Sequence, residues 1–272
     1  MVLFHPDHRG RYLRRVLTLV VLTALGCTPL LPGDDTLDGG FVSDGDASQD
    51  ASDAAICGAA CPCTPQVTGV SRSVVAHGAR LVVEGSCLTG ASMLRIGGVA
   101  QGFAVAGEDL VVDEVFDTTT IGLNVPLVVE TPLGESAPRP LTVVRLVVNE
   151  VDSHTGNGAN DTNEFVELDT GLAAAVDLTG YAVLFVSGDT PTTYDDIPAI
   201  ALGMSAANGR YVIGNPGVSG VRATFPSRSL GESSGVHGVL VVQSDDLPVA
   251  GTALSTIDAP IIGNSFIFKQ TT

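Results

Sequence analysis

Cys27 is the side chain whose surroundings most clearly predict a chemical modification. It follows residues 9–26, in which four arginines come before an apolar run from Val16 to Leu25. As a helix this run would span about 15 Å at about 1.5 Å per residue, half of a hydrocarbon core of about 30 Å. The run is therefore too short for an anchor helix and is typical of an export signal that is cleaved off.

The ending LTALGC, residues 22–27, resembles the bacterial lipobox, in which a diacylglycerol is attached to the cysteine thiol and the signal is cut off in front of it. The sequence departs from the family where Leu usually stands, because Ala24 holds that position and Leu25 follows it. The resemblance implies a signal over residues 1–26 and lipidation of Cys27. The alternative is an ordinary secretory signal with a cysteine just beyond its cleavage site.

Lipidation would place the protein in the cell envelope. Each buried methylene contributes roughly 0.8 kcal/mol, so two or three acyl chains would hold the chain at a membrane surface. Thr28 follows the cysteine where an aspartate would argue for retention in the inner membrane. We therefore expect a membrane-anchored lipoprotein, in the outer membrane or at the cell surface rather than in the inner membrane.

The remaining cysteines are an even number in a chain with an export signal, which predicts two disulfides among Cys57, Cys61, Cys63 and Cys87. If strands over 66–70 and 80–85 pair antiparallel with Val70 opposite Arg80, Cys63 lies opposite Cys87. We predict the pairs Cys63–Cys87 and Cys57–Cys61, although a register slip of two residues would substitute Cys61. A four-thiolate zinc site is the alternative, and the missing CxxC pairs argue against it.

Oxygen donors gather in the segment DSHTGNGANDTNE, and they are Asp152, Asn157, Asn160, Asp161, Asn163 and Glu164. Such donors suit calcium at about 2.3 to 2.6 Å, so a calcium site with Asp152, Asn157, Asp161 and Glu164 is one reading. The favoured reading is a long polar hairpin loop, because Asn, Asp and Gly supply turns and local hydrogen bonds. His154 has no partner cysteine or second histidine nearby, so we expect no metal role for it.

Catalytic motifs are scarce. GESSG, residues 231–235, has the GxSxG form of a nucleophile elbow with Ser233 as nucleophile. That site requires an acid and then a histidine further along the chain, and no histidine follows His237. The sequence also lacks Walker loops, paired histidines and dinucleotide fingerprints. We expect no catalytic residue and no cofactor.

Acidic side chains dominate the charge of the 272-residue chain, which has a formal net charge of −17. Removing residues 1–26 takes away four arginines and one aspartate, and leaves 9 basic and 29 acidic side chains with a formal charge of −20. Lys269 is the only lysine. Nucleic-acid binding needs a basic stripe, so we expect no nucleic-acid partner.

Composition divides the rest of the chain. Residues 27–56 are rich in Asp, Gly, Ser and Ala, which predicts a disordered acidic tether. From Cys57 onward, short apolar runs alternate with turn residues and show no helical period, which predicts an all-β fold. About 210 residues favour two consecutive immunoglobulin-like β-sandwiches over 57–144 and 145–272. No linker separates them, so we expect a short interface and a limited range of angles.

The first unit resembles the IPT/TIG family of immunoglobulin-like domains. The resemblance rests on the order of Pro65, Gly78 before ARLVVEG, LRIGG, NVP and LVVETPLGES. It implies a sandwich that spaces or contacts other molecules, with no catalytic residues. Within it, Gly97 and Gly98 predict a tight hairpin with positive φ, and Gly134 predicts another.

The second unit resembles the bacterial lamin-tail domain. The matching pieces are Asn149–Glu150, EFVEL at 164–168, VDLTGYAV at 176–183 and NGRYVIGN at 208–215. The resemblance implies a second sandwich that acts as a docking module, of a kind often appended to exported hydrolases or surface proteins. Alternation in EFVEL predicts that Glu164, Val166 and Leu168 share one face, and YAVLFV and RYVIG are apolar enough to be central strands.

Together these features predict a non-catalytic cell-envelope lipoprotein that presents two sandwiches for binding, adhesion or scaffolding. A lipid anchor would provide the membrane contact, and the expected partner is a protein or a glycan. One alternative is an enzyme or the accessory subunit of an exported hydrolase. The other is a calcium-dependent adhesion module.

Overall fold

A computed structural model describes residues 63–153, 163–187, 192–193, 199–225, 230 and 236–269, although not the side chains of Val236 or of 265–269. The described residues form strands and loops with one short 3-10 helix, Leu254–Thr256, and contain no α-helix. The predicted all-β fold is therefore confirmed. None of the described segments forms a helix with the length and apolar character that crossing a membrane requires. Residues 1–56, with Cys27 and the acidic segment, and both Cys57 and Cys61 lie outside the described residues.

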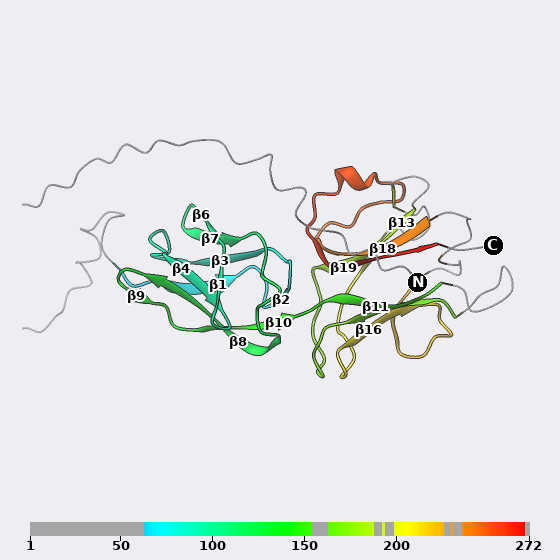
Figure 1. Ribbon diagram of the computed structural model, residues 1–272, viewed down its shortest axis with the longest axis horizontal. Coiled ribbons are helices and arrows are strands. Elements are labelled where there is room, and N and C mark those ends of the chain that lie inside the picture. The colour runs from blue at the N-terminus through cyan, green and yellow to red at the C-terminus, as the bar shows by residue number, and fades with distance from the viewer. Residues whose placement is uncertain are drawn as a thin grey trace, which may run out of the picture. The chain divides into compact units, whose positions relative to one another are not determined.

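The first sandwich has two sheets (Figure 1). One sheet has the strand order β1 (Gln66–Val70), β3 (Leu81–Ser86), β7 (Asp109–Val112) and β6 (Ala104–Ala106). The other has the order β2 (Val74–Ala76), β10 (Arg139–Val144), β8 (Gly122–Thr131), β4 (Met93–Ile96) and β5 (Val99–Gln101), with β9 (Gly134–Glu135) on β8. β2 runs parallel to β10, whereas the other pairs are antiparallel. The chain thus changes sheet between β1 and β2.

Alternation along the strands builds the core between these sheets. Leu81 and Val83 of β3 are fully buried, as are Leu127 and Val129 of β8, while Glu84 is exposed. A period of two residues puts such side chains on one face of each strand, so the apolar faces of the two sheets meet.

Glycines form the tight turns that the sequence predicts. Ile96 pairs with Val99, so Gly97 and Gly98 are the two residues of the β4–β5 turn, with φ of 60° and 81°. Gly134 has φ of 131° after the β8–β9 turn. Residues with a Cβ rarely adopt these conformations, which explains the glycines.

The second sandwich also has two sheets (Figure 1). One has the order β11 (Val147–Asp152), β12 (Phe165–Asp169), β16 (Arg210–Gly214) and β17 (Val221–Thr224). The other has the order β14 (Thr192–Thr193), β13 (Tyr181–Ser187), β18 (Val236–Gln243) and β19 (Ile261–Lys269), with β15 (Ala199–Ala201) on β13. β13 and β16 lie between other strands, as the sequence predicts.

The core of the second sandwich follows the predicted alternation. Glu164, Val166 and Leu168 are buried, whereas Phe165 is only half-buried. Phe185 and Phe225 meet edge to face, with 6.0 Å between ring centroids. Asn264 of β19 ties the two sheets together, because its side chain accepts from the Val148 N–H at 2.7 Å and donates to the Val148 carbonyl at 3.1 Å.

Candidate binding site

The junction between the sandwiches is short and well packed. β10 ends at Val144 and β11 begins at Val147, so only Arg145 and Leu146 lie between the strands. Leu146 is buried, and the Arg145 N–H donates to the Thr170 carbonyl at 2.9 Å. The buried apolar residues on either side of the junction belong to one continuous cluster. The two sandwiches therefore share a core at this point.

Tyr181, at the start of β13, carries its hydroxyl into the first sandwich. The hydroxyl accepts from the Ala76 N–H at 2.9 Å and donates to the Val74 carbonyl at 3.2 Å. The residue is 1% exposed, and burial raises the pKa of Tyr181 to about 12, against the smaller opposing effects of the Ala76 hydrogen bond and the Arg72 charge. A buried N–H needs a partner, so this tyrosine completes the backbone pairing of β2.

Arg72, from the first sandwich, packs against the Tyr181 ring. Its guanidinium lies 5.7 Å from the centroid of the Tyr181 ring and 2.8 Å from the Asp245 carboxylate. Gly180 makes this approach possible, because a Cβ added there would lie 1.6 Å from Arg72 Nη1. Gly180 also has φ of 88°. The backbone conformation therefore favours glycine at this position, and any larger residue would displace the Arg72 guanidinium.

Gln243, at the end of β18, makes a second link between the sandwiches. Its Oε1 accepts from the Arg80 N–H at 2.6 Å, and its Nε2 donates to the Arg80 carbonyl at 2.8 Å. The amide thus pairs with the backbone as a neighbouring strand would. The next residue, Ser244, donates its N–H to the Gly180 carbonyl at 3.1 Å.

A cavity of about 520 Å³ opens beside these links and takes its walls from both sandwiches. The first sandwich contributes Arg72 and Arg80, and the second contributes Gln243–Pro248, Thr252 and Thr256–Pro260. A volume of this size lies within the range of small-ligand sites. The cavity is the candidate binding site, and no local motif in the sequence indicates it.

Charges of both signs line the cavity. Arg72 is paired with Asp245, and Arg80 lies 3.9 Å from Asp113 outside the cavity. Asp246 and Asp258 add two further acids to the lining. Leu247, Pro248 and Ile257 add apolar surface. The lining residues include no histidine or cysteine.

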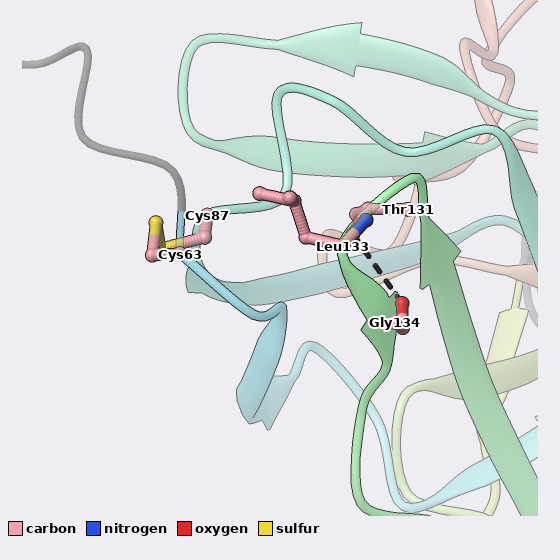
Figure 2. Close-up of a disulfide and its surroundings, with 5 residues drawn as sticks. All are labelled: Cys63, Cys87, Thr131, Leu133 and Gly134. Atoms are coloured by element: carbon pink, nitrogen blue, oxygen red, sulfur yellow. Dashed lines mark hydrogen bonds between the residues drawn. A yellow bond between two sulfur atoms is a disulfide. The ribbon is translucent and has the colours of Figure 1, made fainter.

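The predicted disulfide between Cys63 and Cys87 is confirmed, with a Cα–Cα distance of 5.8 Å. It joins Cys63, which lies shortly before β1, to Cys87, the residue that follows β3 (Figure 2). Thr64 lies next to the β8–β9 turn, because a Cβ on Gly134 would be 3.9 Å from its methyl carbon. Figure 2 shows the Leu133 side chain pointing from this turn toward the disulfide. The partner pair Cys57–Cys61 stays a prediction.

The register behind that prediction is wrong. Val70 pairs with Val83 and not with Arg80, and Gln66 pairs with Ser86. The register shifts between Val67 and Gly69, where one residue is left over in β1. Cys87 itself lies beyond β3 with φ of 60°, outside the strand pairing that the prediction extended to it.

The two described acids of the predicted calcium loop lie in different environments. Asp152 ends β11 and is half-buried, whereas Glu164 is fully buried and its Oε2 accepts from the Leu230 N–H at 2.7 Å. The other two proposed ligands, Asn157 and Asp161, lie outside the described residues. No group of three histidine, cysteine or acidic residues suited to a metal occurs in the part of the chain that the structure describes. The favoured reading as a polar loop and the calcium alternative both stay untested.

Of the GxSxG match, Ser233 lies outside the described residues, and His237 is buried within β18. His154 also lies outside them. The expectation that the chain has no catalytic residue is therefore still a prediction.

Comparisons with known proteins give little further information. No family model matches the chain, and no curated protein matches it. Among solved structures, the human OSCAR ligand-binding domain is similar at 11% sequence identity and a TM-score of 0.28, over 76% of this chain and 98% of that one. A TM-score this low supports no conclusion about fold or function. The assignment as a two-sandwich all-β protein rests on the strands described above.

Proposed function

We propose that this chain is a non-catalytic lipoprotein of the bacterial cell envelope, whose two sandwiches act as one rigid binding unit. Cys27 carries the lipid anchor, residues 28–56 form the tether, and the sandwiches meet a protein or glycan partner. The lipobox-like ending of the leader supports the anchor. The order of turn and strand motifs, similar to IPT/TIG and lamin-tail domains, supports a docking role.

The observation that carries the binding role is the interlocked junction. Tyr181, Arg72 and Gln243 each connect one sandwich to the other, and the cavity beside them belongs to both. Several well-made contacts hold a binding surface in one shape, which lowers the entropy lost when a partner binds. A junction of this kind suits a scaffold that presents a fixed surface.

Metabolic labelling tests the anchor. Cells that express the full chain are grown with a radiolabelled fatty acid, and the Cys27→Ala variant serves as the matched control. We expect label in the wild-type protein and its recovery with the membrane fraction, and neither in the variant. An unlabelled, soluble wild-type protein with an intact amino terminus would overturn the proposal.

The enzyme alternative has a separate test. The purified chain is incubated with nuclease, phosphatase and glycosidase substrates, and we expect no turnover above buffer. Turnover that one carboxylate substitution abolishes, with the fold retained, would replace the binding role by catalysis.

A further inference from the structure

One side of the first sandwich is bounded by residues 99–106, which cross from one sheet to the other. β5 is the outermost described strand of its sheet and β6 the outermost of the opposite sheet, and Gly102 and Phe103 join them. Among the described strands, none pairs with the outer side of either. An outer strand leaves backbone N–H and C=O groups directed away from the sheet, where another chain can pair with them.

This segment lacks the charges, prolines and bulges that protect many sheet edges. Residues 99–106 contain no charged residue and no proline, and all three residues of β6 are exposed, with Val105 47% exposed. Outer strands normally carry charges, prolines or bulges that discourage pairing. β5 and β6 are short, but the two strands and their connection make a continuous uncharged segment.

An exposed aromatic ring is fixed beside this segment. The Phe116 N–H donates to Gln101 Oε1 at 3.0 Å, and Gln101 Nε2 donates to Thr119 Oγ1 at 2.9 Å. Gln101 is buried, so these bonds hold the loop after β7 against β5. Phe116 itself is exposed, and a Cβ on Gly102 would lie 3.8 Å from its ring. The edge therefore has an apolar anchor next to it.

The surroundings are acidic. Arg95 of β4 lies opposite Ala100 of β5, but its guanidinium is paired with Glu130 and Glu135. No lysine or arginine occurs between Arg95 and Arg139, whereas the β6–β7 turn, the start of β7 and the loop after it carry Glu108, Asp109, Asp113, Glu114 and Asp117. Arg80 lies 3.9 Å from Asp113, and both side chains are more than half exposed, so this contact offsets little of the charge. An arriving strand thus meets uncharged backbone bordered by negative charge.

The charge decides between possible occupants. A second copy of the chain would bring the same acids together, and residues 28–56 carry seven aspartates and no basic residue. Like charges across a strand pair are destabilising, so neither is favoured at this edge. A basic segment gains attraction instead, within the roughly 8 Å over which charges act at physiological salt.

We propose that residues 99–106 are a strand-addition site for an extended segment of a partner protein in which lysine or arginine alternates with apolar residues. Backbone hydrogen bonds hold the segment, its apolar side chains pack on Phe116 and Val105, and its basic side chains face the acids. The inference rests on the proposed binding function and names the chemistry of the partner.

The probe is a fluorescent six-residue peptide, blocked at both ends, in which lysine alternates with valine. A peptide with glutamate in place of lysine and one with a central proline are the controls. Binding to the purified full chain is followed by fluorescence anisotropy at two salt concentrations, and hydrogen exchange locates the protected amides. We expect binding of the lysine peptide alone, weakened by salt, with protection in 99–106.

Substitutions at the edge sharpen the test. Both Val105→Lys and Val105→Glu lose the apolar contact with the peptide, but only lysine adds repulsion against the basic side chains. Val105→Lys should therefore bind the lysine peptide about tenfold or more weakly than Val105→Glu does. Leu123→Lys is the matched control, since Leu123 is 53% exposed on β8 of the same sandwich. Circular dichroism checks that each variant is folded.

Each other result overturns the inference. Equal binding of the glutamate peptide removes the charge argument, binding of the proline peptide removes strand pairing, and protection elsewhere removes the site. Concentration-dependent dimers that protect 99–106 assign the edge to a second copy. Loss of peptide binding with intact lipidation at Cys27 refutes this site alone, whereas failed lipidation with intact peptide binding refutes only the envelope anchor.

Discussion

Replacing Gly180 by alanine tests the junction most directly. The new Cβ would lie 1.6 Å from Arg72 Nη1, so the guanidinium must leave its place over Tyr181. At φ of 88°, alanine also adopts a left-handed conformation that costs about 1–2 kcal/mol. Gly180→Ala therefore combines a backbone cost with the loss of the Arg72 contacts.

The size of the effect follows from those contacts. The cation–π contact between Arg72 and Tyr181 contributes about 0.5–1 kcal/mol at a partly exposed site. The ion pair with Asp245 contributes less than about 1 kcal/mol, because the Asp245 side chain is 78% exposed and solvent screens the pair. With the backbone cost, Gly180→Ala should lower the free energy of unfolding by about 2–4 kcal/mol.

Gly220→Ala separates the two causes. Gly220 has φ of 78°, and nothing lies within 4 Å of a Cβ added there, so this variant should lose only the backbone part, about 1–2 kcal/mol. Urea unfolding followed by circular dichroism measures both variants, and each also in an Arg72→Ala background. There, Gly180→Ala should cost no more than Gly220→Ala. Equal losses for the two glycine variants in the wild-type background would refute the clash with Arg72.

Three further predictions concern other features. The pKa of Tyr181 in the folded state is raised from 10.0 to about 12, so the stability present below pH 10 should fall between pH 10 and 12. Urea unfolding at pH 8 and at pH 11 should show about 1 kcal/mol of this loss in the wild type. The Tyr181→Phe variant should not show it. Tyr181→Phe should also lose about 1–3 kcal/mol at pH 8, since it leaves the Ala76 N–H unpaired. Replacing Cys63 and Cys87 together by serine should lower the free energy of unfolding by about 2–4 kcal/mol in the same assay. A loss near zero would show that the disulfide does not stabilise the folded chain relative to the unfolded one. Melting in calcium and in chelator should give equal midpoints, whereas a rise with calcium would support the alternative of a calcium site that includes Asp152 and Glu164.

Local patterns predicted the strands well. The strand expected over 66–70 is β1, and the hairpin at Gly97 and Gly98 has the two-residue turn that positive φ allows. These features depend on neighbouring residues: alternation decides which side chains are buried, and a missing Cβ decides where the chain can turn.

The pairing register of β1 with β3 could not be predicted from the sequence pattern. The prediction assumed a simple hairpin between 66–70 and 80–85, but β2 leaves for the other sheet and pairs with β10. A register shift between Val67 and Gly69 then moves Val70 opposite Val83. Neither event has a strong local signal, because each depends on how the opposite sheet packs.

The candidate site was also not predictable. Ala76 and Tyr181 are 105 residues apart, and Arg80 and Gln243 are 163 apart. In the sequence Gly180 reads only as a turn residue, and the Arg72 side chain that needs its space lies on the other sandwich. Such contacts arise when two folded units meet, so their specificity is a property of tertiary packing.

The disulfide also determines how the folded part bears mechanical load. β1 is the outermost described strand of its sheet, whereas β3 lies between β1 and β7. Tension applied to the chain ahead of Cys63 crosses the sulfur bridge to Cys87 and enters β3 directly. The hydrogen bonds of β1 are therefore not broken one pair at a time by this tension. The resistance to pulling depends instead on β3, which is hydrogen-bonded on both sides.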